Sequence, residues 1–254
     1  MNPSIFNDVI GPVMRGPSSS HCAASIRIGR MCLDLMDGDI QEVYVEFDPN
    51  GSLATTHKGQ GSDMGLFGGF LGWEAYDERL VHSEIHLGAA GIKVNIEIKD
   101  IQAEHPNTYK ITLSNPWETH QVVAISTGGG MIEVIEIDGT KVSLAGDCFL
   151  TLIYATDKQK LKTYLQQSGV FEELEIHTDE GDFLAIKSSA FLNETLIEEI
   201  KAMEGVSQVK QIKPVLPVLT GKNQTVPFIT CDEMMAYNQD KNLSLWELAV
   251  RYES

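Results

Sequence analysis

Apolar residues recur at two spacings along the chain, and each spacing predicts one type of element. Alternation of apolar and polar residues is typical of strands, and apolar residues three to four positions apart are typical of helices. The alternation predicts strands over residues 42–47, 92–98, 109–113, 121–126, 131–137, 141–144, 149–155, 171–178, 183–188 and 206–212. The helical spacing predicts helices over residues 20–36, 157–167, 193–203, 233–238 and 245–253, one beginning near Asp63, and a helical turn or two within residues 1–10.

These elements indicate an α+β protein in three parts. Residues 149–212 have the order β-α-β-β-α-β, which is that of a ferredoxin-like unit. We place boundaries at Ala145-Gly146-Asp147 and in the proline-containing linker over residues 213–227, which gives parts 1–146, 147–218 and 219–254. The two short helices of the last part cannot bury much surface alone. They are either the start of a larger part or a docking arm.

Glycines in the first part predict turns and sites of close packing. Asp138-Gly139 between two strands predicts a hairpin turn, and residues 127–130 predict a loop with several left-handed positions. Glycines at three-to-four spacing over residues 61–72 favour close backbone packing. Only the polar loop over residues 58–63 is favoured as functional, because it precedes the start of a helix.

The helix that begins near residue 20 opens with three serines and a histidine after Gly16-Pro17. Its N-cap is expected among Ser18, Ser19 and Ser20. The free N–H groups of a first turn, with hydroxyl and imidazole groups beside them, can bind a carboxylate or phosphate. The alternative is an ordinary serine cap on a buried helix.

Composition narrows the choice of function. The chain has 254 residues and a net charge of −17, which argues against nucleic acid or anionic lipid as a partner. Its four cysteines form no C-x-x-C motif, so we expect no complete metal site in this chain and reduced thiols. Without a signal pattern or an apolar run of about 18 residues, we expect a cytoplasmic protein that does not span a membrane.

Four ordered motifs resemble those of the iron–sulfur L-serine dehydratases, in their β subunit or N-terminal half. The motifs are GPSSSH, FDPNGSLATTHKGQGSD, HPNT and STGGG, and the resemblance covers residues 3–145. It implies a serine-dehydratase β domain similar to the allosteric substrate-binding domain of some phosphoglycerate dehydrogenases. Residues 147–218 resemble an ACT-like domain, and residues from 228 on resemble the opening of the catalytic α part.

The resemblance implies that L-serine loses water by β-elimination and yields pyruvate and ammonia. It also implies a [4Fe–4S] cluster that acts as a Lewis acid on the leaving hydroxyl. That cluster belongs to an α subunit or a covalently following α domain. The chain is then expected to be inactive alone and to form a homo-oligomer.

Matching motifs assign roles to residues. His21 and Ser20 are the candidate catalytic residues. The candidate substrate-binding residues are Ser18, Ser19, Gln60, Ser62, Asp63, His105, Asn107 and Thr108. Gly128, Gly129 and Gly130 match the glycine loop of the family. For HPNT a proline turn with a capping asparagine is the structural alternative.

One residue departs from the family pattern. Many members have histidine where this chain has Gln60, and an amide cannot act as a base. His21, His57 or a residue of the α part then removes the proton, or the substrate differs from serine. Cys22 replaces a frequent threonine and is expected to be buried. His82, His86, His120 and His177 are expected to be structural or on the surface.

The alternative function is a non-catalytic regulatory module. In that case the HPNT segment holds L-serine as an effector, and the ACT-like part senses amino acids on behalf of a partner enzyme.

Overall fold

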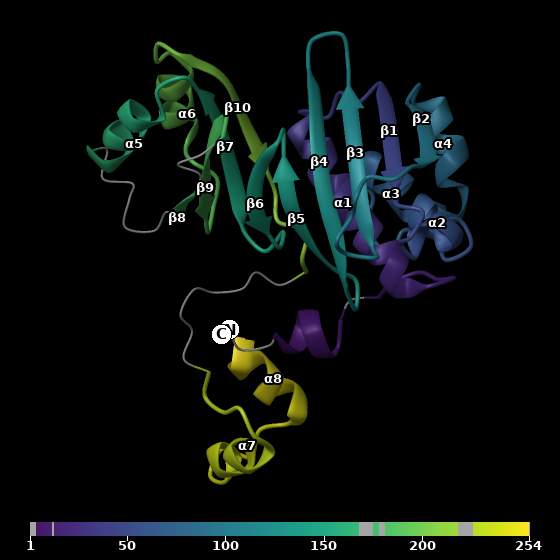
Figure 1. Cartoon of the computed structure of the whole chain (residues 1–254). Helices are drawn as coiled ribbons and strands as arrows, with labels where there is room; N and C mark the ends of the chain where they lie inside the picture. Colours follow the sequence, from purple (N-terminus) through teal and green to yellow (C-terminus); the bar gives the residue numbers. More distant parts are fainter. Residues whose placement is uncertain (1–3, 12, 168–174, 178–180, 218–225, 254) are drawn as a thin grey trace. The chain divides into compact units, whose positions relative to one another are not determined.

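The computed structural model describes residues 4–11, 13–167, 175–177, 181–217 and 226–253 (Figure 1). These residues form two compact units. The larger unit is Met14–Val215, and the smaller one combines Met1–Val13 with Leu216–Ser254.

A mixed sheet forms the first half of the larger unit, and its strands run in the order β2-β1-β3-β4-β5-β6. The β1–β2 pair is parallel and the other pairs are antiparallel. The strands are β1 (Glu42–Phe47), β2 (Lys93–Ile98), β3 (Thr108–Ser114), β4 (Thr119–Gly128), β5 (Met131–Ile137) and β6 (Thr140–Leu144). The helices are α1 (Ser19–Leu35), α2 (Leu53–Thr56), α3 (Ser62–Phe70), the 3-10 helix η2 (Glu78–His82) and α4 (Ser83–Ala89).

The α1 and α3 helices cover one face of this sheet. Ile28 of α1 and Leu66 of α3 share one apolar core with Val45, Ile111 and Ala124 of the strands. The alternation along the strands produces this core, because every second side chain points to the same face.

Two glycines bring α1 and α3 together. A Cβ atom on Gly29 would lie 2.6 Å from the carbonyl oxygen of Leu66, and one on Gly69 would lie 2.4 Å from that of Ile26. The expectation of close backbone packing along the glycine stripe is therefore confirmed at this crossing.

The second half of the larger unit is a four-stranded sheet in the order β10-β7-β9-β8. Its elements are β7 (Phe149–Ala155), α5 (Lys158–Gln167), β8 (Glu175–His177), β9 (Phe183–Ser188), α6 (Glu194–Lys201) and β10 (Val206–Ile212). Their order along the chain is the predicted β-α-β-β-α-β. Residues 171–174 and 178 of the predicted strand lie outside the described residues.

Each face of the second sheet has its own apolar cluster. Ile153 and Ile186 pack with Leu161 of α5 and Ile197 of α6. Leu152 and the other residues of the opposite face join the core of the first sheet. Both sheets therefore belong to one compact unit, and the predicted domain boundary near residue 146 stays a prediction.

The smaller unit joins the π-helical turn η1 (Ile5–Val9) to α7 (Cys231–Asn238) and α8 (Leu245–Glu253). The Glu253 carboxylate accepts hydrogen bonds from the Ser4 hydroxyl at 3.0 Å and from the Phe6 amide at 3.3 Å. Thr230 caps α7 in a capping box with Glu233. Residues 218–225 of the predicted linker lie outside the described residues.

The structure corrects two local predictions. Gly61, with φ +84°, holds the N-cap position of α3, so this helix begins at Ser62, one residue before the predicted start near Asp63. Strand β4 continues through Thr127 to Gly128, so the loop is shorter than predicted, although the expected left-handed positions are present at residues 128–130. The alternation and capping patterns also did not predict α2, η2 or α4, because these short helices carry no sustained apolar period.

Candidate functional site

The tip of α1 is open to solvent. Ser18 occupies the N-cap position, but its side chain makes no capping hydrogen bond. Its hydroxyl lies 2.8 Å from Nδ1 of His21 and 3.5 Å from the Ser20 hydroxyl. Ser19 is exposed, and Ser18, Ser20 and His21 are half-buried. The first turn therefore keeps its partial positive charge beside hydroxyl and imidazole groups, an arrangement suited to a small anion.

A second helix start lies against this tip. The Ser18 amide donates to the Gln60 carbonyl at 3.2 Å, and the Ser62 amide donates to the His57 carbonyl at 2.8 Å. Nδ1 of His57 lies 2.7 Å from Oδ1 of Asp63. The two side chains are 21% and 15% exposed, so the pair is partly shielded and still reachable. Oε1 of Gln60 is buried and has no hydrogen-bond partner among the described residues.

Tyr109 and Ser62 place two hydroxyls in the interior below these helix starts. Both residues are fully buried, and neither hydroxyl has a hydrogen-bond partner of good geometry within the described structure. The pKa of Tyr109 is raised to about 12, chiefly by burial and to a smaller extent by nearby Asp63 and Cys22, while the Ser62 hydroxyl opposes this rise. Tyr109 is therefore a neutral hydroxyl at physiological pH.

The HPNT segment is held between the loop before α2 and the end of β4. The Ser52 hydroxyl donates to Oδ1 of Asn107, and the Ser52 amide donates to the carbonyl oxygen of Pro106 at 2.8 Å. The Ser126 amide donates to the Asn107 carbonyl at 3.0 Å. Asn107 is half-buried and lies beside the end of β4, where the glycine loop begins.

His105 and Thr108 serve the shape of this segment. Nδ1 of His105 accepts from the Asn107 amide at 3.1 Å, and the Thr108 hydroxyl donates to the His105 carbonyl at 2.7 Å. These bonds within the segment are those of the proline turn considered as the alternative, so His105 and Thr108 have a structural role here. Nε2 of His105 takes part in neither bond.

The glycine loop closes against α1. Gly128, Gly129 and Gly130 have φ values of +106°, +61° and +85°. Buried Arg27 of α1 donates to the Gly130 carbonyl. A Cβ atom on Gly130 would lie 3.1 Å from Cβ of Ala23, so glycine fits both the dihedral angle and the space.

These contacts bring the predicted residues into two linked groups. Ser18, Ser20 and His21 meet the Gln60–Asp63 turn through the Ser18–Gln60 hydrogen bond. A second link runs through α2, which begins after Ser52 at the HPNT segment and ends before His57. No hydrogen bond among the described residues joins His21 directly to Asn107.

Sequence reasoning missed two features of this site. Tyr109 directly follows HPNT, so its place next to a motif was the available signal. The His57–Asp63 pair was not anticipated, although both residues stand in one motif, because a six-residue separation brings them together only across the turn.

Two of the four cysteines are poorly suited to bind iron. Cys22 and Cys32 are fully buried, and burial raises the pKa of Cys22 to about 11 and that of Cys32 still higher. Cluster ligation requires thiolates. Within the described ranges, no three His, Cys, Asp or Glu side chains gather in a way that could hold a metal ion. Cys22 and Cys32 therefore do not fit the role of cluster ligands.

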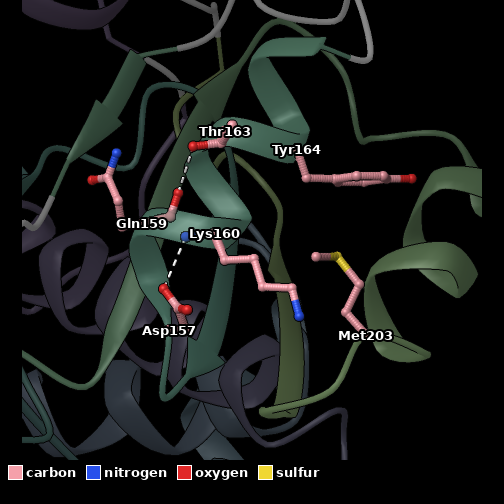
Figure 2. Close-up of a pocket in the computed structure, with 6 residues that line it drawn as sticks. All are labelled: Asp157, Gln159, Lys160, Thr163, Tyr164 and Met203. Carbon is pink, nitrogen blue, oxygen red and sulfur yellow. Dashed lines mark hydrogen bonds between the residues drawn. The ribbon is translucent and has the colours of Figure 1, made fainter.

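A separate hollow lies on the second sheet's helical side (Figure 2). It encloses about 480 Å³ and is lined by Asp157, Gln159, Lys160, Thr163, Tyr164 and Met203. The Tyr164 hydroxyl donates to Glu199 at 2.6 Å. None of the predicted site residues lines it.

Comparison with known proteins identifies the family. No family model matches the chain. The chain is 40% identical over 155 residues to a probable L-serine dehydratase β chain of Bacillus subtilis (strain 168), a match that covers 61% of this chain and 69% of that protein. The chain belongs to the L-serine dehydratase β-chain family.

A second member of the family agrees with this assignment. The L-serine dehydratase β chain of Peptoniphilus asaccharolyticus is 32% identical over 160 residues, covering 62% of this chain and 71% of that protein. The resemblance drawn from the four motifs is therefore confirmed. None of the described helices has the length and apolar character needed to cross a membrane.

Proposed function

We propose that this chain is the β part of an iron–sulfur L-serine dehydratase, which converts L-serine to pyruvate and ammonia. Membership of the L-serine dehydratase β-chain family carries this proposal. The open tip of α1 supports the place of substrate binding, because the Ser18 hydroxyl is turned to His21 and leaves the first turn uncapped.

In this proposal the α1 tip binds the carboxylate of L-serine. The N–H groups and hydroxyls of Ser18–Ser20 supply donors, and the helix dipole favours a negative charge there. Asn107 contributes polar contacts from the neighbouring HPNT segment. A small amino acid with one carboxylate suits this set of donors better than a large or uncharged ligand.

An α partner completes the enzyme. The names of both relatives describe β chains, and we infer an α chain that binds the [4Fe–4S] cluster. The cluster would act as a Lewis acid on the substrate hydroxyl, a poor leaving group. This chain would hold the substrate and control its protons.

Reconstitution tests the reaction. The chain is combined with an α partner under anaerobic conditions with iron and sulfide, and pyruvate formation from L-serine is measured. We expect turnover only when both chains are present. Equal maximal rates for the α partner with and without this chain would overturn the catalytic assignment.

Calorimetry tests the place of binding in the chain alone. We expect Ser18→Ala to weaken L-serine binding at least tenfold, since one hydroxyl and its bond to His21 are lost. Ser143→Ala is the matched control, because that exposed hydroxyl donates to Glu133 and lies outside the proposed site. Equal binding by both variants would contradict the proposed location.

A regulatory role for the second sheet is a compatible proposal. Its β-α-β-β-α-β order and its strand order β10-β7-β9-β8 support the interpretation as an ACT-like domain. A chain that only sensed serine would change the serine concentration at half-maximal rate and leave the maximal rate of its partner unchanged. The reconstitution above separates the two functions.

A further inference from the structure

We propose that His57, oriented by Asp63, is the base that removes the Cα proton of the substrate. The inference rests on the proposed function and deepens it. The chain has glutamine at residue 60, and the Gln60 amide cannot accept a proton at neutral pH. The elimination nevertheless needs a base, because the Cα proton is weakly acidic.

The His57–Asp63 geometry is that of an oriented imidazole base. A carboxylate 2.7 Å from Nδ1 favours the tautomer in which Nδ1–H donates to Oδ1 and Nε2 carries the lone pair. Asp63 also stabilises the imidazolium once Nε2 has taken a proton. Asp63 is thus a positioning residue, and His57 is the residue that meets the substrate.

His21 lacks this support. Its Nδ1 lies 2.8 Å from the neutral hydroxyl of Ser18, which stabilises a positive imidazolium less than a carboxylate does. His21 is better placed to contribute to carboxylate binding at the α1 tip. Of the two histidines near the tip, His57 is therefore the one that a carboxylate orients for proton removal.

The position of His57 also suits the role. The His57 carbonyl accepts a hydrogen bond in the turn that contains Gln60, and the Gln60 carbonyl accepts one from the Ser18 amide. On its other side, His57 follows α2, which begins after Ser52, and the Ser52 hydroxyl donates to Asn107. His57 therefore stands between the carboxylate-binding tip and the HPNT segment. The Phe47 ring packs 5.2 Å from the imidazole ring, centroid to centroid, and restricts its orientation.

The proton balance is complete. Nε2 of His57 takes the Cα proton, and the C–H electron pair becomes the second bond between Cα and Cβ. The Cβ–O bond breaks, and the leaving hydroxide takes a proton from the His57 imidazolium to form water. The remaining 2-aminoacrylate tautomerises and adds water to give pyruvate and ammonia.

Substitution of His57 tests the inference in the reconstituted complex. We expect His57→Asn to lower kcat about 10²–10⁴-fold. The kinetic isotope effect with L-[2-²H]serine is expected to rise because proton removal becomes slower. L-Serine binding by the chain alone, measured by calorimetry, is expected to change less than threefold. His82→Asn is the control, because His82 is exposed and outside the site.

Substitution of Asp63 tests orientation. Asp63→Asn places an amide donor against Nδ1, which moves the proton to Nε2 and blocks the base. We expect kcat to fall at least tenfold with KM changed less than threefold, and the acidic limb of the pH–rate profile to shift. Asp63→Glu keeps the carboxylate and is expected to recover part of the rate.

The outcomes separate this inference from the proposed function. An inactive wild-type complex with intact cluster would count against the dehydratase proposal itself. An active complex in which His57→Asn keeps the wild-type rate and isotope effect would overturn only the role of His57. If His57→Asn keeps the wild-type rate while His21→Asn lowers the rate and raises the isotope effect, His21 is the base.

Discussion

At the residue scale, burial decides how the ionisable groups around the site behave. Cys22 lies in the first turn of α1, yet it is fully buried, and burial raises its pKa to about 11. Position at a helix start would lower a thiol pKa, so desolvation outweighs the dipole here. The expected role of Cys22 as a small buried side chain is confirmed.

This shift predicts a dependence of stability on pH. The unfolded thiol ionises above about pH 9 and the folded thiol above about pH 11, so the folded state binds more protons in between. Folding stability from Cys22 is present below pH 9 and is lost as the pH rises to 11, by about 2–3 kcal/mol in total. Urea unfolding from pH 8 to 10.5 should show a smaller loss for Cys22→Ala than for wild type.

Exposed Cys231 supplies the control for this measurement. Cys231→Ala should follow the wild-type curve, because the Cys231 side chain is exposed in the folded protein. Parallel curves for wild type and Cys22→Ala would show that Cys22 does not carry the effect.

At the element scale, the crossing of α1 and α3 places the two helix starts next to each other. The absence of side chains at Gly29 and Gly69 allows this approach, since any Cβ would meet backbone atoms of the facing helix. The Ser18–Gln60 hydrogen bond at the tip then follows from packing several turns away.

Gly69→Ala is therefore expected to destabilise the protein. A Cβ there would lie 2.4 Å from the Ile26 carbonyl oxygen and force the helices apart. Overpacking of about 1–3 kcal/mol exceeds the gain of about 1 kcal/mol in helix propensity. Gly88→Ala in α4 is the matched control, because nothing lies within 4 Å of its Cβ position. Urea unfolding should show destabilisation for residue 69 and a small stabilisation for residue 88.

Prediction from sequence succeeded where one local rule governs an element. Strands over 42–47, 149–155, 183–188 and 206–212 were predicted with the bounds found, since alternation marks each one. Four short motifs led to the correct family. The His57–Asp63 pair and the burial of the Tyr109 hydroxyl depend on how α2, α3 and β3 pack, which no local pattern contains.

At the scale of the larger unit, an ion cluster around the buried Lys210 side chain joins the two sheets and the end of α1. Nζ of Lys210 on β10 donates to both carboxylate oxygens of Glu118, at 2.8 and 2.7 Å, and to Asp37 at 2.7 Å. The Lys210 side chain is 4% exposed. Asp37 follows the C-terminal end of α1, so Lys210 of the second sheet holds that end of the helix. The N-terminal end of the same helix forms the candidate site.

Lys210→Met should destabilise the protein by about 3 kcal/mol. The change leaves the Glu118 carboxylate, 12% exposed, without its cation, and an uncompensated buried charge costs more than the ion pair contributes. Adding Glu118→Gln to Lys210→Met should restore part of the loss, because the charge disappears. Lys201→Met is the control: its partner Glu198 is exposed, and such pairs contribute about 0–1 kcal/mol. Urea unfolding of wild type, Lys210→Met, Glu118→Gln and the double variant measures the coupling, and additive losses for the two single variants would show that the cluster does not act as a unit.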